Sequence, residues 1–184
     1  MMMMTQSIPA RFDETRPFLA VNIAVLTVSD TRTAETDKSG DALAAMIEAD
    51  GHLVAHRLIL KDDADVIAAQ LDVWISDPTI DCIITTGGTG VTGRDVTPEA
   101  FDRVLEKKSD GFGEMFRWLS FQMIGTSALQ SRAVGGVSQG TYMFALPGST
   151  GAVEDGWTKI LRFQLDNRHR PCNLVELMPR LQEV

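Results

Sequence analysis

The residues whose types and spacing suit chemistry lie in one stretch, DCIITTGGTGVTGRDVTPEA, from Asp81 to Ala100. An apolar run there ends in four glycines within seven residues, and an arginine and an aspartate follow. Glycine has no Cβ, so the backbone N–H groups of such a loop can approach a phosphate closely. The pattern therefore predicts an anion-binding loop. A tight strand-to-helix turn without a ligand is the alternative.

Two better-known phosphate motifs do not fit this loop. Gly88, Gly90 and Gly93 have the spacing of a dinucleotide fingerprint, but no strand ending in a ribose-binding acid follows about 20 residues later. A P-loop requires Gly-Lys-Ser/Thr, where this chain has Gly93-Arg94-Asp95. A nicotinamide-dependent oxidoreductase would therefore rest on glycine spacing alone.

Two aspartates add a second chemical property. Asp95 follows the glycines, where a bare carboxylate would repel a phosphate unless Mg²⁺ bridged the two. Asp62, at the end of another predicted strand, is a candidate second oxygen ligand. The alternatives are structural: Asp62 as a helix N-cap, and Asp95 bonded to its own backbone. Their shared position at strand ends favours a role in a site.

Basic side chains near these loops are candidate partners for an anionic ligand, and exposure to solvent is the alternative for each of them. The candidates are Arg32, Lys38, Arg94 and Arg132.

The elements that must position these residues are three apolar, β-branched runs. They predict buried strands at Asn22–Ser29, His52–Leu60 and Asp81–Thr86, each followed by a helical pattern. Parallel strands joined in this way have right-handed crossovers. The predicted fold class is therefore α/β, in three layers, with a mostly parallel sheet and helices on both faces.

Ligands of such sheets bind beyond the carboxyl ends of the strands. Four loops should therefore face one another: those after Ser29 and after Leu60, the glycine loop, and LPGST after a strand ending at Leu146. Thr97 is the predicted N-cap of the helix after the glycine loop, and Lys107 and Lys108 are predicted to close that helix.

Length and composition favour one domain over residues 21–184 and a mobile N-terminal tail over residues 1–20. The start codon among the four N-terminal methionines stays open. A net charge of −8 argues against general nucleic-acid binding. No apolar segment reaches the roughly 20 residues of a membrane span. Two distant cysteines, Cys82 and Cys172, fit unpaired thiols in a reducing cytoplasm.

Six ordered blocks carry a resemblance to a known family: TVSDTR, DKSGD, TTGGTGVTGRDVTPEA, GFGEMFR, IGTSALQSRAVGGV and ALPGST. Together they resemble the MoaB/Mog family of molybdenum-cofactor biosynthesis proteins, the MoaB branch in particular. The resemblance runs from about Val21 to Asn173. It implies a molybdopterin-binding α/β domain that assembles as a homotrimer or a dimer of trimers.

The resemblance also implies an activity, molybdopterin adenylyltransferase. AMP passes from ATP to the terminal phosphate of molybdopterin, pyrophosphate leaves, Mg²⁺ is the expected ion, and a MoeA-type protein takes the product for metal insertion. A non-catalytic molybdopterin-binding or carrier protein of the same fold is the alternative.

The family's catalytic, metal-holding aspartates match Asp62 and Asp95, although Asp63 is one position away from the first match. The resemblance further implies a set of substrate-binding residues. These are Ser29, Asp30, Gly87, Gly88, Thr89, Gly90, Pro147, Gly148 and Ser149.

Overall fold

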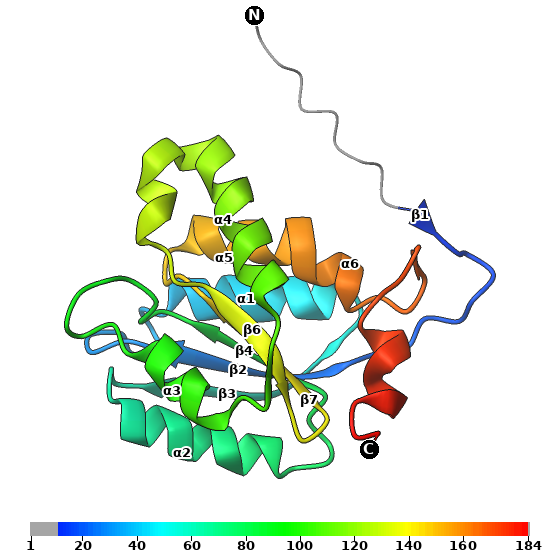
Figure 1. The fold of residues 1–184 in the computed structure, drawn as a ribbon, viewed down its shortest axis with the longest axis horizontal. Helices are drawn as coiled ribbons and strands as arrows, with labels where there is room; N and C mark the ends of the chain where they lie inside the picture. Colours follow the sequence, from blue (N-terminus) through cyan, green and yellow to red (C-terminus); the bar gives the residue numbers. More distant parts are fainter. Residues whose placement is uncertain (1–10, 184) are drawn as a thin grey trace, which may run out of the picture.

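The computed structural model describes residues 11–183. Its main feature is a six-stranded sheet in the order β3-β2-β4-β7-β6-β5 (Figure 1). Strands β3, β2, β4 and β7 are parallel neighbours, and β6 pairs antiparallel with both β7 and β5. The strands are β2 (Asn22–Val28), β3 (Leu53–Leu60), β4 (Cys82–Thr86), β5 (Lys107–Lys108), β6 (Val134–Ser138) and β7 (Thr141–Leu146).

Helices cover both faces of this sheet, which confirms the predicted fold class (Figure 1). One face packs against α1 (Lys38–Ala49), α4 (Asp110–Ile124) and α5 (Thr150–Gly156), and the other against α2 (Ala64–Ile75) and α3 (Thr97–Val104).

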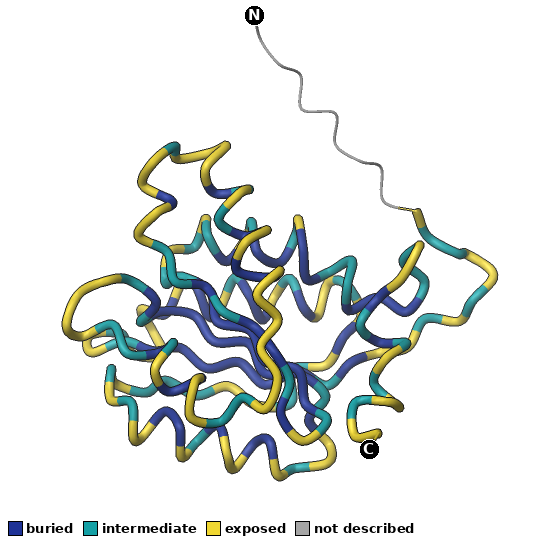
Figure 2. The backbone as a smooth tube through the Cα atoms, in the orientation of Figure 1, coloured by how far each residue is buried: buried dark blue, intermediate teal, exposed yellow. Residues whose placement is uncertain are grey.

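Each face has its own hydrophobic core because β4, at the middle, is buried along its whole length (Figure 2). Alternate strand residues point to opposite faces. Ile84 accordingly packs with Trp157 in one core, and Ile83 packs with Phe101 in the other. The strand ends are therefore held firmly, and the loops that leave them start from fixed positions.

Short helical segments complete the chain. Helix α4 continues into the 3-10 helix η1 (Gly125–Gln130), and α5 continues through a π-helical turn, η2 (Trp157–Leu161), into α6 (Arg162–Gln164). The 3-10 helix η3 (Val175–Arg180) lies near the C-terminus. None of the helices in residues 11–183 has the length and apolar composition of a membrane span.

Residues 11–20 differ from the predicted mobile tail, of which residues 1–10 lie outside the described part. Strand β1 (Arg11–Phe12) pairs antiparallel with β8 (His169–Arg170). The Leu19 N–H donates to Asn167 Oδ1 at 2.9 Å, and Asn167 Nδ2 donates to the Pro17 carbonyl at 2.9 Å. Since these partners lie near the other end of the chain, local sequence could not indicate them.

The lysine pair Lys107–Lys108 was wrongly predicted to close a helix. Helix α3 ends earlier, at Val104, and the two lysines form β5, the edge strand. Lysine is well suited to both positions, because it favours a helix C-terminus and also protects a sheet edge from further pairing.

His52 is a buried ring that ties the N-terminal segment to the domain. Its side chain is 3% exposed, its Nδ1 accepts a hydrogen bond from the Val21 N–H at 3.1 Å, and it contacts the rings of Phe18 and Trp157. An accepting Nδ1 carries no proton. Burial lowers the pKa of His52, and the carboxylates of Asp166 and Asp50 oppose that effect without cancelling it.

This burial predicts an acid-sensitive contribution to stability. The folded-state pKa of His52 lies below its ordinary value of 6.5, so the unfolded chain takes up the proton first as pH falls. The contribution is present above about pH 6.5 and is lost as pH falls below it. Urea unfolding at about pH 8 and about pH 5.5 measures the free energy of unfolding at each pH. The decrease from the higher pH to the lower one should be smaller for His52→Gln than for the wild type.

The exposed His56 provides a matched control. His56→Gln should keep the wild-type difference between the two pH values. An unchanged difference in His52→Gln would contradict the role given to the buried ring.

Candidate active site

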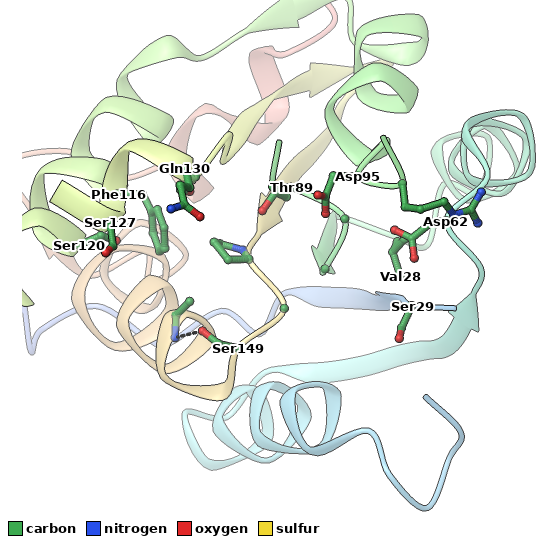
Figure 3. A pocket seen from close by; sticks show the side chains of 18 of the residues that line it. Val28, Ser29, Asp62, Thr89, Asp95, Phe116, Ser120, Ser127, Gln130 and Ser149 are labelled. Carbon is green, nitrogen blue, oxygen red and sulfur yellow. Dashed lines mark hydrogen bonds between the residues drawn. The ribbon is translucent and has the colours of Figure 1, made fainter. Parts of the chain in front are cut away.

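One cavity of about 530 Å³ opens beyond the carboxyl ends of the parallel strands. All four predicted loops contribute to it: Ser29 after β2, Asp62 after β3, Gly88 after β4 and Gly148 after β7. Figure 3 shows Asp62 and Asp95 at one end of the cavity, and Phe116, Ser120, Ser127 and Gln130 at the other. The loops thus face one another, as the parallel order of the strands requires.

The structure brings nearly all of the predicted site residues to this cavity. Its lining includes Ser29, Asp62, Gly87, Gly88, Thr89, Gly90, Asp95, Pro147, Gly148 and Ser149. The exception is Asp30, which is outside the lining. Asp30 forms a two-point ion pair with Arg94, at 2.8 and 2.9 Å, and accepts from the Asp62 N–H at 3.3 Å. Its visible role is to hold two neighbouring loops together.

The glycine loop is built by close backbone contacts. Gly87 and Gly88 have φ values of +101° and +65°, a region that side chains with a Cβ rarely adopt. A Cβ on Gly87 would lie 2.1 Å from the Val28 carbonyl oxygen, and one on Gly88 would lie 2.4 Å from Thr97 Oγ1. Both glycines are therefore required by conformation and by space.

Thr97 has a different role from the predicted N-cap. It is the first residue of α3, and Val96 is the N-cap. The Thr97 hydroxyl donates to the Gly87 carbonyl at 2.9 Å, and its N–H donates to the Gly88 carbonyl at 3.0 Å. Thr97 therefore ties the start of the helix to the glycine loop.

The N–H groups of the loop suit an anion. Gly87 N–H donates to the Leu146 carbonyl at 3.0 Å, whereas those of Gly88 and Thr89 donate to no residue in the described range 11–183. Gly88 and Thr89 both line the cavity. Since a backbone donor rarely stays without a partner, these two groups favour a bound acceptor.

The structure separates Asp62 from Asp63. Asp63 is the N-cap of α2, and its carboxylate accepts from the N–H groups of Asp65 and Val66 at 3.0 and 3.2 Å. Asp62 instead lines the cavity, with Oδ1 2.9 Å from the position of a Cβ on Gly88. The capping alternative thus applies to Asp63, and Asp62 is the carboxylate available to a ligand.

Asp95 combines the two roles that the sequence left open. Its Oδ2 accepts from the N–H and the hydroxyl of Thr92, at 2.8 and 2.6 Å, and the residue also lines the cavity. Its carboxylate lies close over Gly90, 2.7 Å from the position of a Cβ on that glycine. The local hydrogen bonds orient the carboxylate without removing it from the cavity.

The two carboxylates differ in pKa. Burial raises the pKa of Asp62, and the negative charges of Asp30 and Asp95 add to this effect. Burial also acts to raise the pKa of Asp95, but hydrogen bonds from Thr92 and Gly90 and the charge of Arg132 together outweigh it, so that pKa is lowered. Mutual repulsion of carboxylates at one end of a cavity favours a cation there.

Mg²⁺ fits this donor set as an ion shared with a ligand. Asp62 and Asp95 supply hard oxygen donors, which Mg²⁺ prefers. Within residues 11–183, however, no group of three or more histidine, cysteine, aspartate or glutamate side chains can hold a metal. A site with only two carboxylates is typical of a Mg²⁺ ion whose other ligands are phosphate and water oxygens.

Of the predicted cations, Arg32 and Arg94 line the cavity, and Lys38 and Arg132 do not. Arg32 donates to the Gly148 carbonyl at 2.6 Å and lies 3.6 Å from the carboxylate of buried Asp37. Arg94 makes the ion pair with Asp30. These two guanidinium groups bring positive charge to the same cavity as the two carboxylates.

The wall opposite the carboxylates was missed at the sequence level. It consists of residues from α4, η1 and the segment after it: Phe116, Ser120, Ile124, Ser127, Ala128, Gln130 and Ser131. The block IGTSALQSRAVGGV covers part of this wall, and its run of small and polar residues within a helical segment was the available signal.

A mostly parallel sheet with a cavity beyond the carboxyl ends of its strands is typical of an α/β ligand-binding protein. The family described as "Probable molybdopterin binding domain" matches residues 24–167. Molybdenum cofactor biosynthesis protein B of Escherichia coli K12 is 46% identical over 156 residues, covering 85% of this chain and 92% of that protein.

Solved structures agree with this match. A crystal structure of molybdenum cofactor biosynthesis protein B has a TM-score of 0.79 and 41% identity, covering 82% of this chain and 94% of that one. The Mog protein of Mycobacterium ulcerans has a TM-score of 0.70 and 30% identity, covering 79% and 97%. The chain therefore belongs to the MoaB/Mog family, on its MoaB branch, and has a role in molybdenum cofactor biosynthesis.

The glycine loop yields a paired test of backbone conformation. Gly88→Ala places a Cβ at positive φ and against Thr97, so it should lower the free energy of unfolding by about 1–3 kcal/mol. Gly93→Ala meets no atom within 4 Å and should change it by less than about 0.5 kcal/mol. Chemical denaturation measures both. Equal effects would contradict the conformational requirement at Gly88.

Proposed function

We propose that the protein is a molybdopterin adenylyltransferase. The observation that carries this proposal is the meeting of a glycine loop and two carboxylates, Asp62 and Asp95, in one cavity, where the Gly88 and Thr89 N–H groups have no partner among residues 11–183. Transfer of an adenylyl group brings two phosphorylated anions together, and its main demand is for donors and cations that offset their charge.

The proposed reaction forms one bond and breaks another at the α-phosphorus of ATP. An oxygen of the terminal phosphate of molybdopterin bonds to that phosphorus, the bond to the bridging oxygen breaks, and its electron pair leaves with pyrophosphate. No protein nucleophile is needed. In this proposal the amides of Gly88 and Thr89 and the guanidinium of Arg32 bind phosphate oxygens and hold the two substrates in register.

Asp62 and Asp95 are the residues that would hold Mg²⁺. When bound, the ion would offset the negative charge on the phosphate oxygens. The lowered pKa of Asp95 keeps that carboxylate ionised, while the raised pKa of Asp62 makes it the first of the two to lose its charge as pH falls. Metal affinity should therefore fall first through protonation of Asp62.

We further propose that the opposite wall accommodates a substrate's heterocycle. The buried ring of Phe116, 1% exposed, gives the floor of that end an apolar character, and Ser120, Ser127 and Gln130 supply hydrogen-bonding groups there (Figure 3). A flat, polar ring system such as a pterin needs both kinds of contact. The remaining part of the proposal is cellular: the reaction consumes ATP in the cytoplasm, and a MoeA-type protein receives the product.

The alternative is a non-catalytic molybdopterin-binding or carrier protein of this fold. The amides of Gly88 and Thr89 would serve such a protein equally well. The carboxylates distinguish the two functions, because a carrier has no need to place Mg²⁺ between two phosphorylated substrates.

We also propose assembly as a homotrimer or a dimer of trimers through α4 and η1. These helices project from the body of the domain (Figure 1), and they expose a set of large apolar side chains. The set is Met115, Trp118, Phe121, Met123, Ile124 and Leu129. Several large exposed apolar side chains on two consecutive helices favour contact with another protein chain.

Asp62→Asn and Asp95→Asn should each reduce adenylyl transfer by about 100-fold or more, because each removes a proposed metal ligand. The assay mixes the protein with molybdopterin, Mg²⁺ and ATP labelled at the α-phosphate and measures labelled adenylylated pterin. Asp63→Asn is the matched control and should keep activity, because asparagine caps a helix as well as aspartate does.

Two outcomes would count against this assignment. Loss of activity in Asp63→Asn but not in Asp62→Asn would move the metal role to the neighbouring carboxylate. Wild-type protein that binds molybdopterin and yields no labelled product would favour the carrier.

Trp118→Glu should shift the native mass toward the monomer in light scattering, because Trp118 is 61% exposed on the proposed contact surface. Val73→Glu, at a similarly exposed valine on α2, should leave the mass unchanged. A native mass of Trp118→Glu equal to that of the wild type would place the contact elsewhere.

A further inference from the structure

Arg132 makes an unusual set of hydrogen bonds to the glycine loop. Its backbone N–H donates to the Thr89 carbonyl at 2.9 Å. Its Nε donates to the Gly90 carbonyl at 2.6 Å, and its Nη2 donates to the Asp95 carbonyl at 2.7 Å. One residue therefore holds three backbone carbonyls of a loop that lies about 40 positions earlier in the chain.

These contacts differ from the role that the sequence suggested for Arg132, a cation opposite an anionic ligand. Arg132 is outside the lining of the cavity, and its guanidinium donates to carbonyl oxygens of the protein itself. Arg132 contacts the loop without lining the cavity, so it can affect a ligand only by placing Gly90 and Asp95, which do line it.

Glu99 anchors the guanidinium from a second element. The Glu99 carboxylate, on α3, forms an ion pair with Arg132, through Nη1 and through Nη2. The side chains of Arg132 and Glu99 are 33% and 49% exposed, so the pair lies at the surface and its value is in orienting the guanidinium. Arg132 thus links the end of η1, the start of α3 and the loop between Gly90 and Asp95.

The planar guanidinium explains why arginine stands here. Its N–H groups point in fixed directions, so one side chain can reach Gly90, Asp95 and Glu99 together. Lysine carries the same charge on a single rotating ammonium group and cannot keep this geometry. The contacts therefore depend on shape as well as on charge.

We propose that Arg132 is a positioning residue that, with Glu99, fixes the Gly90–Asp95 loop and so aims the Asp95 carboxylate into the cavity. The catalytic part of this inference rests on the proposed adenylyl transfer; the structural part does not.

A small displacement of the loop has a large expected effect. Misplacement of a reacting group by about 1 Å costs on the order of 100-fold in rate. Arg132→Lys keeps the positive charge but loses the fixed N–H groups of the guanidinium that reach Gly90 and Asp95. It should therefore lower kcat by about 10- to 100-fold with a smaller change in KM for ATP. Glu99→Gln should act in the same direction and less strongly, because the bonds to the loop remain.

Arg117→Lys is the matched control. Arg117 is a partly buried arginine that also donates to a backbone carbonyl, that of Ala133 at 3.1 Å, and it is outside the cavity lining. Arg117→Lys should keep wild-type kcat. It reports the general cost of replacing a partly buried arginine that donates to a backbone carbonyl.

Hydrogen exchange in the protein without ligand tests the structural part directly. The hydrogen-bonded amides of the loop, those of Thr92, Arg94 and Asp95, should exchange at least about 10-fold faster in Arg132→Lys than in the wild type, and Arg117→Lys should leave them unchanged. Exchange rates in Arg132→Lys equal to those of the wild type would overturn the proposal that Arg132 fixes the loop. Faster exchange with unchanged kcat would overturn its role in positioning.

Failure of the proposed function is distinguishable from failure of this inference. If the wild type makes no adenylylated pterin, the transferase proposal fails, and the exchange of the Thr92, Arg94 and Asp95 amides alone decides whether Arg132 fixes the loop. If Arg132→Lys does not fold, Glu99→Gln gives the same two measurements with the loop contacts intact.

Discussion

The cavity depends on one close backbone approach, that of Gly87 to the end of β2. A Cβ at this position would lie 2.1 Å from the Val28 carbonyl oxygen, so only glycine lets the glycine loop pack against the end of β2. The same residue donates its N–H to the Leu146 carbonyl and accepts the Thr97 hydroxyl at its own carbonyl. The ends of β2, β4 and β7 and the start of α3 therefore converge on Gly87, and the ligand-facing groups are placed from there.

The charged groups of the site are held by two separate sets of contacts. The backbone of Asp62 is held by Asp30, which accepts from the Asp62 N–H and is itself paired with Arg94. Asp95 is fixed by Thr92 on its carboxylate and by Arg132 on its carbonyl. For the proposed adenylyl transfer, groups that are held in place in advance need little reorganisation when substrates bind, and this is the condition under which electrostatic stabilisation is most effective.

Much of this site could be predicted from the sequence because its loops follow strongly patterned strands. The runs before Ser29 and before the glycine loop are apolar and β-branched, and parallel strands align their carboxyl ends. Asp62 and Asp95 could thus be paired without coordinates. The choice between Asp62 and Asp63 could not be made, since either aspartate suits the N-cap and only the turn after β3 shows which carboxylate caps α2.

The sequence by itself determined the α/β class, and it placed the glycine loop and the two aspartates Asp62 and Asp95 at the ends of strands, since these follow from local patterns of residue type. Tertiary structure alone decided the roles of residues whose partners are distant. Arg132 reaches a loop about 40 positions away, Asp30 binds Arg94, and residues 11–20 pack against residues near the C-terminus. The physical reason is that a charged or polar side chain can satisfy its hydrogen bonds with many partners, and only the folded chain selects which of them lies within reach.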